Sequence, residues 1–376
     1  MALLGLALLV PSAGAPASPS GSVVTWGCGN NNAGQCAAEG VPARVTAIAA
    51  GTYHSLALMD NGRILLWGLT TTPPSDLSSV TAIAAGGTQN LALKSDGTVV
   101  AWGCERGFDA GQCNVPSGLS GVTAIATGTY HSLALKSDGT VVAWGCGGFT
   151  QHGQCEVPSG LSTVTAIAGG NYQSLALKSD GTVIAWGCIR VPTGQCDVPS
   201  GLTGVTAISA GDSHSLALKS DGTVVAWGCG GGLDFGQCNV PSGLSGVTAI
   251  AAGYAHSLAL KRDGTVVAWG CAGGMDSGQC AVPNGLSHVT AVAAGFAHSL
   301  ALVARPAAAP CRVPNVVGKP LASARRTIAT RHCRVGKIAY ASSGKRKGIV
   351  ISQNRKPGRV LPAGSKVKLV VSRGRR

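Results

Sequence analysis

The chain repeats one pattern of hydrophobic and polar positions, and a clear copy is the segment 122–146, VTAIATGTYHSLALKSDGTVVAWGC. In VTAIA, SLAL and TVVAW, large or β-branched residues alternate with small ones at a spacing of two, which predicts strands and not helices. Ser-Asp-Gly between the second and third runs predicts a tight turn, since Asp bonds its own backbone and Gly accepts a positive φ. The run Q-C-x-V-P that follows predicts a fourth strand at the edge, where proline is tolerated.

Successive copies are about 42 residues apart, except for one interval of 35. They start at Val45, Val80, Val122, Val164, Val205, Val247 and Val289. Four strands in each unit, repeated radially, predict an all-β seven-bladed β-propeller. The last copy stops at Leu302 without its third run, and the missing half is found at Ser20–Gly27. We therefore expect the N-terminal strand to close the ring, which leaves few open sheet edges.

Patterning divides the chain into four parts. Residues 1–17 contain a short apolar core and end in Ala15-Pro16-Ala17, as a secretory leader does, although Lys and Arg are missing near Met1. Residues 18–302 form the propeller, residues 303–311 a Pro/Ala linker, and residues 312–376 a basic domain. No later stretch approaches 18 consecutive apolar residues, so we expect a soluble mature chain without a transmembrane span. We also expect a monomer.

Charge is divided unevenly between the two predicted domains. Arg305–Arg376 holds 19 Lys and Arg residues and no acid, whereas residues 1–302 hold 10 against 15. Such a segment attracts anionic wall polymers, membrane surfaces or nucleic acid, and salt weakens the attraction in each case. The alternative is a solvent-exposed basic surface without a specific ligand. Export and the lack of base-stacking aromatic residues beside the charges argue against nucleic acid.

The fourteen cysteines fall into pairs. Six units carry W-G-C followed eight or nine residues later by G-Q-C, and the unit after Trp67 has lost both cysteines together. Joint loss is expected for local disulfides, since a single leftover thiol is a liability in an oxidising compartment. Zinc is the rival interpretation, but the spacing exceeds C-x2-C and the loops between the cysteines hold no regular histidine, so we expect no metal. The predicted pairs are Cys28 with Cys36, Cys104 with Cys113, Cys146 with Cys155, Cys188 with Cys196, Cys229 with Cys238, Cys271 with Cys280, and Cys311 with Cys333.

The units differ from one another at one rim of the predicted propeller. The turn between the first and second runs and the cysteine-bounded loop share this rim and vary widely, whereas S-D-G and V-P-S-G-L on the opposite rim hardly change. Eight of the nine Phe and Tyr residues fall on the variable rim. Aromatic rings on rigid loops are typical of protein-binding surfaces, although plain divergence of exposed loops also explains the variation. The candidate contact residues are Tyr53, Phe108, Tyr130, Phe149, Tyr172, Asp212, Phe235, Tyr254 and Phe296.

Catalytic and cofactor sites are not singled out. A histidine recurs at one repeat position, and Gln89 and Gln173 replace it in two units, which favours a structural hydrogen-bond donor over a catalyst. No phosphate-binding loop of the G-x-x-x-x-G-K-[ST] type is present. We therefore expect a non-catalytic protein without a cofactor.

The repeat V-T-A-I-A-A-G-x-x-H-S-L-A-L-x-x-D-G-x-V-x-A-W-G-x-x-x-x-G-Q resembles that of the regulator of chromosome condensation family, over Ser20–Leu302. The resemblance implies a seven-bladed propeller. The founding member is a nucleotide-exchange factor for a small GTPase, with longer repeats. The compact form is more similar to the secreted bacterial propeller that inhibits beta-lactamases through aromatic and acidic rim residues. That similarity implies contact roles for Tyr53, Tyr130, Tyr172, Asp212, Tyr254 and Phe296, but the added cysteine loops do not allow the target to be transferred.

The tail resembles a single PASTA domain over about Arg312–Gly374, on V-P-N-V-V-G-K, S-Q-x-x-x-P-G and G-S-K-V-K-L-V-V-S. The resemblance implies binding to peptidoglycan fragments or beta-lactams. Basic candidates for contact with the wall polymer are Lys345, Arg346, Lys347, Arg355 and Lys356.

Together these features predict a secreted or wall-associated binding protein, with a protein partner at the propeller rim and peptidoglycan or an anionic wall polymer at the tail. The alternatives are a GTPase-regulating propeller, which requires reduced thiols, and an enzyme acting on wall sugars, which requires convergent acids.

Overall fold

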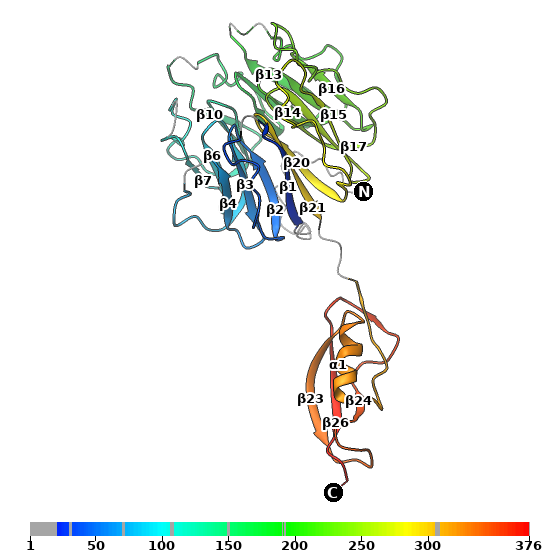
Figure 1. The fold of residues 1–376 in the computed structure, drawn as a ribbon. Helices are drawn as coiled ribbons and strands as arrows, with labels where there is room; N and C mark the ends of the chain where they lie inside the picture. The colour runs from blue at the N-terminus through cyan, green and yellow to red at the C-terminus, as the bar shows by residue number, and fades with distance from the viewer. Residues whose placement is uncertain are drawn as a thin grey trace. The chain divides into compact units, whose positions relative to one another are not determined.

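The computed structural model describes residues 21–29, 32–69, 72–105, 109–148, 151–189, 191, 193–304 and 309–375. The chain divides into two compact units, Met1–Arg305 and Pro306–Arg376, shown in Figure 1. The predicted leader, residues 1–17, lies outside the described residues.

The first unit is built from three-stranded repeats that follow the alternating runs of the sequence. The first strands are β2 (Val45–Ala50), β5 (Val80–Ala85), β8 (Val122–Thr127), β11 (Val164–Gly169), β14 (Val205–Ala210), β17 (Val247–Ala252) and β20 (Val289–Ala294). The second strands are β3 (His54–Met59), β6 (Asn90–Lys94), β9 (Ser132–Lys136), β12 (Gln173–Lys178), β15 (Ser215–Lys219), β18 (His256–Lys261) and β21 (His298–Ala304). The third strands are β4 (Ile64–Gly68), β7 (Val99–Trp102), β10 (Val141–Trp144), β13 (Val183–Gly187), β16 (Val224–Trp227), β19 (Val266–Gly270) and β1 (Gly21–Gly27).

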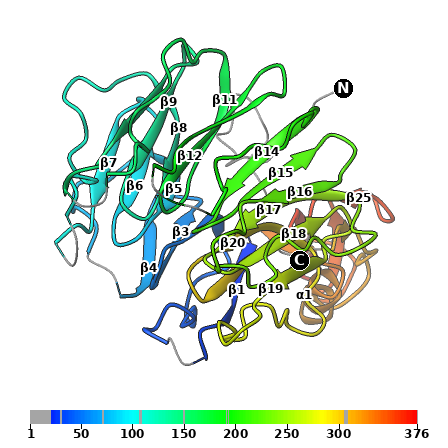
Figure 2. The ribbon, with the colours of Figure 1, turned by 90° about the horizontal axis from the view of Figure 1, so that it is seen from above.

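The N-terminal strand completes the last repeat, as predicted. β1 pairs antiparallel with β21 along its whole length, from Gly21 opposite Ala304 to Gly27 opposite His298. Five sheets contain three strands each, and the sixth has the order β20-β21-β1-β2-β3-β4 because Gly21 also pairs with Val45 of the next repeat. Figure 2 shows the sheets following one another in chain order from blue to yellow, which brings β1 back beside the last repeat.

The expected fourth strand is absent from the described repeats, so this prediction was wrong. After G-Q-C the backbone forms tight local turns instead. Asn114 N donates to Gly111 O (2.9 Å), Val115 N to Cys113 O (3.0 Å) and Leu119 N to Pro116 O (3.2 Å). These bonds use the backbone groups that an edge strand needs, and the proline has no N–H to offer.

The hydrophobic core lies between neighbouring sheets. Leu91 and Leu93 of one sheet pack with Ile125, Ala134 and Trp144 of the next. The same packing joins the last repeat to the first, where Leu300 and Leu302 meet Ile48 and Trp67. The first strands surround a central cavity of about 810 Å³. This radial arrangement is the one expected of a propeller.

The second unit has its own small core and an α+β fold. Its elements are β22 (Cys311–Arg312), α1 (Leu321–Ala329), β23 (Arg334–Ala341), β24 (Val350–Gln353), β25 (Val360–Leu361) and β26 (Lys366–Ser372). The central strand β26 pairs parallel with β23 and antiparallel with β24. Ala324 and Ile328 of the helix are buried against Val350, Val367 and Leu369 of the sheet. None of the described helices is both long enough and apolar enough to cross a membrane.

Candidate functional site

A short turn joins the first and second strands of each sheet, and these turns form one rim of the central cavity. Each turn begins with a glycine, such as Gly51, Gly128 or Gly211. A Cβ atom on Gly128 would collide with the carbonyl oxygen of Gly170 in the next repeat and with the ring of His131. The glycine thus lets neighbouring turns approach closely, which fixes the positions of the residues that follow it.

A belt of buried histidine and serine side chains lies directly beneath these turns. His131 Nε2 is 2.9 Å from Ser174 Oγ of the neighbouring sheet, and that hydroxyl donates to Gln154 O (2.9 Å). Since the serine proton is used in this way, the imidazole must donate from Nε2. The equivalent pairs are His54–Asn90, His214–Ser257, His256–Ser299 and His298–Ser55. Burial lowers the pKa to about 3 for His131, His214, His256 and His298 and to about 4 for His54.

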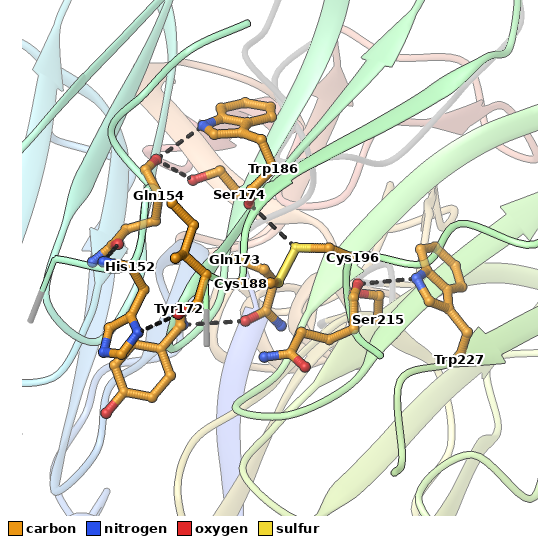
Figure 3. The surroundings of a disulfide bond; sticks show 12 residues. His152, Gln154, Tyr172, Gln173, Ser174, Trp186, Cys188, Cys196, Ser215 and Trp227 are labelled. Carbon is orange, nitrogen blue, oxygen red and sulfur yellow. Dashed lines mark hydrogen bonds between the residues drawn. A yellow bond between two sulfur atoms is a disulfide. The ribbon is translucent and has the colours of Figure 1, made fainter. Parts of the chain in front are cut away.

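The cysteine-bounded loop is anchored by the glutamine of its G-Q-C motif, as Figure 3 shows for one repeat. The Gln154 carbonyl accepts from the Trp186 indole (2.9 Å) as well as from Ser174, and the Gln154 side chain accepts from His152 N (2.7 Å). These bonds hold the loop against the neighbouring sheet.

Disulfide bonds close six of these loops, and a seventh bond lies in the second unit. The structure pairs all fourteen cysteines in the order that their spacing indicates and leaves none free. The loop bonds join residues eight or nine positions apart, so each of them closes within a single repeat. The bonds join Cys28 and Cys36, Cys104 and Cys113, Cys146 and Cys155, Cys188 and Cys196, Cys229 and Cys238, Cys271 and Cys280, and Cys311 and Cys333.

The aromatic residues of the turns form two groups around the cavity mouth. Tyr130 and Tyr172 stack with ring centroids 6.1 Å apart. On the other side, Phe296 lies 4.3 Å from Tyr254 and 5.6 Å from Tyr53, centroid to centroid. Tyr53 is 36% exposed, and the other four rings are half-buried. All five line a hollow of about 380 Å³ at the mouth.

Asp212 occupies the turn between these two aromatic groups. It is half-buried, and its Oδ2 accepts a hydrogen bond from Ser213 Oγ (2.9 Å). Loss of solvent raises the pKa of this carboxyl to about 6. Burial, with the nearby Asp212 charge among the further causes, also raises the pKa of Tyr172 and Tyr254. The sequence singled out this acid, but its altered acidity depends on neighbours that only the fold provides.

The structure does not bring all candidate residues of the rim together. Phe235 lies on an outer cysteine-bounded loop, where its carbonyl accepts from Ala272 N (2.9 Å) in the next loop. Phe108 and Phe149 lie outside the described residues. Sequence reasoning missed His152, whose ring centroid lies 4.2 Å from that of Tyr172 and whose Nδ1 donates to Ile189 O (2.8 Å). The feature of the sequence that could have indicated His152 is its position in a variable cysteine-bounded loop, away from the repeat position at which the other histidines recur.

In the second unit, the basic candidates flank β24 at its two ends. Lys345, Arg346 and Lys347 precede the strand, whereas Arg355 and Lys356 follow it, and all five are exposed. Gln353 fixes the second group by donating to Arg355 O (2.7 Å) and to Pro314 O (3.0 Å). Three large apolar side chains of this unit are also exposed, Val317, Tyr340 and Val360.

Comparison with known proteins identifies both units. The model of the regulator of chromosome condensation (RCC1) repeat matches residues 45–71, 122–154, 205–237 and 247–279, and that of the PASTA domain matches residues 312–373. No curated protein matches the chain at a significant level.

Among solved structures, Prp20p from Saccharomyces cerevisiae is 21% identical with a TM-score of 0.60, over 76% of this chain and 92% of Prp20p. The ectodomain of the receptor kinase CR4 from Physcomitrella patens is 19% identical with a TM-score of 0.53, over 66% and 68% of the two chains. Human WBSCR16 is 18% identical with a TM-score of 0.51, over 69% and 86%. At sequence identities this low, the comparison shows similarity of fold only. The chain thus carries repeats of the regulator of chromosome condensation family, folded as a propeller, and one C-terminal PASTA domain.

Proposed function

We propose that the protein is an exported, non-catalytic binding protein, whose propeller rim binds a protein partner and whose PASTA domain binds peptidoglycan. The observation that carries the proposal is the convergence of five aromatic side chains and Asp212 at the mouth of the propeller. RCC1 propellers typically have binding or regulatory roles, and PASTA domains are associated with wall ligands.

The rim has the physical properties of a binding surface. Its aromatic rings belong to turns that are held by glycine contacts, buried hydrogen bonds and adjacent disulfides, so little conformational entropy is lost on binding. Half-exposed tyrosines also combine a large apolar area with a polar tip, which makes them frequent anchors of interfaces.

Seven disulfides support an extracellular or cell-wall location, because such bonds persist in oxidising compartments. The predicted leader, residues 1–17, fits the same destination. At the wall, the 19 cations of Arg305–Arg376 would favour contact with anionic polymers, while Val317, Tyr340 and Val360 offer apolar surface.

Replacement of two rim tyrosines tests the protein-binding role. We expect Tyr130→Ala with Tyr172→Ala to abolish capture of partner proteins from envelope extracts, since truncation of a hot-spot aromatic residue costs about 2 kcal/mol or more. Capture followed by mass spectrometry measures this. Arg262→Ala is the matched control, because this exposed residue follows β18 at the end opposite the rim. Equal capture by the double variant and the control would place the partner site elsewhere.

A salt series tests the role at the wall. We expect the full chain to sediment with purified peptidoglycan, saturably and with retention at about 0.3 M salt, where simple screening removes most nonspecific attraction. Replacement of Lys345, Arg346 and Lys347 by alanine is expected to weaken retention at low salt. A propeller that ends at residue 304 is the control and should not bind. If binding to peptidoglycan vanishes at high salt, or if the chain binds DNA equally well, the tail acts only as a nonspecific polycation.

A further inference from the structure

The hollow at the propeller mouth combines aromatic faces with a single carboxylate. It is about 380 Å³ in volume and is lined by rim turns from all around the central cavity. Its aromatic side chains are those of Tyr53, Tyr130, Tyr172, Tyr254 and Phe296. Among the described residues that line it, Asp212 is the only charged one, and it lies on the turn between the two aromatic groups.

Asp212 has no cationic partner among the residues that the structure describes, and its carboxylate accepts the Ser213 hydroxyl instead. The turns of the opposite rim differ, since five of their aspartates each pair with the lysine two positions earlier. These pairs are Lys94–Asp96, Lys136–Asp138, Lys178–Asp180, Lys219–Asp221 and Lys261–Asp263. A half-buried carboxylate without a counter-ion is unfavourable, and a cation arriving from outside would relieve this cost.

The surroundings favour a cation over other ligands. The faces of tyrosine and phenylalanine rings attract ammonium and guanidinium groups within about 6 Å of the ring centroid. The variable turns and loops also carry an excess of negative charge, five acids against Arg106 and Arg190. The acids are Glu105, Asp109, Asp212, Asp234 and Asp276. A partner with a basic contact surface is therefore complementary to this rim.

We propose that the propeller mouth binds the ammonium or guanidinium group of a Lys or Arg side chain that the protein partner inserts between the two aromatic groups, with Asp212 as its counter-ion. This inference rests on the proposed partner-binding role of the rim. It specifies the chemistry of the central contact.

Binding through Asp212 depends on pH in a defined direction. The titratable groups around the carboxyl are Tyr172 and Tyr254 on the neighbouring turns and His214 on its own repeat. Their pKa shifts, upward for the tyrosines and to about 3 for the histidine, keep all three neutral near pH 6. The pKa of Asp212 is raised to about 6, so the carboxylate forms and the cation site strengthens as the pH rises through 6.

The test uses the full chain labelled with 3-fluorotyrosine and observed by ¹⁹F NMR. Four of its five tyrosines lie at the mouth, and Tyr340 in the second unit is an internal control. The probes are the tripeptides acetyl-Gly-Lys-Gly-amide and acetyl-Gly-Arg-Gly-amide, with the ε-acetylated lysine peptide as the neutral control. We expect the cationic peptides to shift the mouth resonances saturably, with affinity roughly tenfold higher at pH 7.5 than at pH 5.0. Tyr340 should not respond.

Asp212→Asn keeps the shape and removes the charge. We expect it to weaken cationic peptide binding by about tenfold or more and to abolish the pH dependence. Asp76→Asn removes the same charge from an exposed connector before β5 and should bind as the unaltered protein does. If Asp212→Asn fails to fold, the pH dependence of the unaltered protein decides. Equal binding of the acetylated peptide, unchanged affinity in Asp212→Asn, or no response at the mouth would overturn the inference.

The two proposals fail separately. A partner captured through Tyr130 and Tyr172, with no response to the peptides, would overturn the cation site and leave the partner-binding rim standing. A peptide response that depends on Asp212, with no partner captured, would support the cation site and contradict the wider proposal.

Discussion

Each buried histidine beneath the variable rim serves as a neutral hydrogen-bond donor between neighbouring sheets. Its ring is almost fully inaccessible, so the charged form loses its hydration and the pKa falls to about 3 or 4. In two repeats Gln89 and Gln173 replace the histidine and donate to carbonyl oxygens in the turn of the next repeat. The requirement at this position is therefore an uncharged donor of suitable length, and not an imidazole.

These histidines predict acid sensitivity. Their folded-state pKa values lie below the unfolded value near 6.5, so the unfolded chain binds more protons and stability falls as the pH drops from about 6.5 toward 4. The loss can reach about 1.4 kcal/mol per pH unit for each histidine. Asp212 acts in the opposite sense, because its pKa is raised. Urea midpoints measured between pH 7 and 4.5 should therefore decline.

His131→Gln is the matched control for this effect. Since glutamine is accommodated in two other repeats, the variant should fold at pH 7 and lose less stability on acidification than the unaltered chain. A urea midpoint that stays constant between pH 7 and 4.5 in the unaltered chain would contradict the assignment of neutral, buried rings.

Within one repeat, three strands form the sheet, and the cysteine-bounded loop packs against the neighbouring sheet at the rim. The loop holds its position through the glutamine carbonyl, which accepts from both a tryptophan indole and a serine hydroxyl in most repeats. The repeat that contains Trp67 keeps this bond, from the Trp67 indole to Gln35 O (2.8 Å). Gln35 lies in the Cys28–Cys36 loop, so the glutamine anchor and the disulfide occur together there. The loop after Trp67 has neither the cysteines nor the glutamine, and the Trp102 indole of the next repeat has no hydrogen-bond partner among the described residues.

Removal of one disulfide tests how much stability the bond adds to the glutamine anchor of its loop. We expect Cys146→Ser with Cys155→Ser to lower the free energy of unfolding by about 2.5 kcal/mol, the value for closing a loop of roughly ten residues, while the fold is kept. Urea unfolding measures the change. The corresponding replacement of Cys311 and Cys333 should cost more, because that bond closes a longer loop in a much smaller core. Equal and negligible costs at both sites would show that the bonds add no stability.

The propeller as a whole depends on the pairing of its two ends. β1 forms the outer strand of the last repeat, and Trp26 packs there among Leu258, Leu260 and Val289 of the preceding and last repeats. Its indole also donates to Gln279 O (2.9 Å). The N-terminal strand therefore completes the last sheet, and it adds to the direct packing of the last repeat against the first.

Deletion of residues 18–27 is expected to open this ring. The loss of β1 exposes β21 as an unpaired apolar edge, so the shortened chain should aggregate or pair with a second copy. Size-exclusion chromatography and the thermal midpoint measure the outcome. Trp26→Ala is a milder variant and should cost about 3–5 kcal/mol, as other buried Trp→Ala changes do. A truncated chain that stays monomeric with an unchanged midpoint would contradict closure by β1.

The sequence by itself determined the repeat, the identity of its three strands, the return of β1 to the last repeat, the order of the cysteine pairs and the presence of a PASTA domain. These features follow from side-chain alternation, turn residues and spacing, all of which are local or periodic. The predicted fourth strand was wrong because the alternation in Q-C-x-V-P did not reveal that local turns use its backbone groups.

Only the tertiary structure decided how the rim works. Each feature of the rim brings together turn or loop residues of different repeats, more than 19 positions apart in the chain. These features are the two aromatic groups, the contact of His152 with Tyr172 and the desolvation of Asp212. The pKa of a side chain and its contacts depend on the atoms packed around it. The periodic sequence pattern determines where the sheets lie. It does not specify which of the variable turn residues meet at the mouth of the propeller.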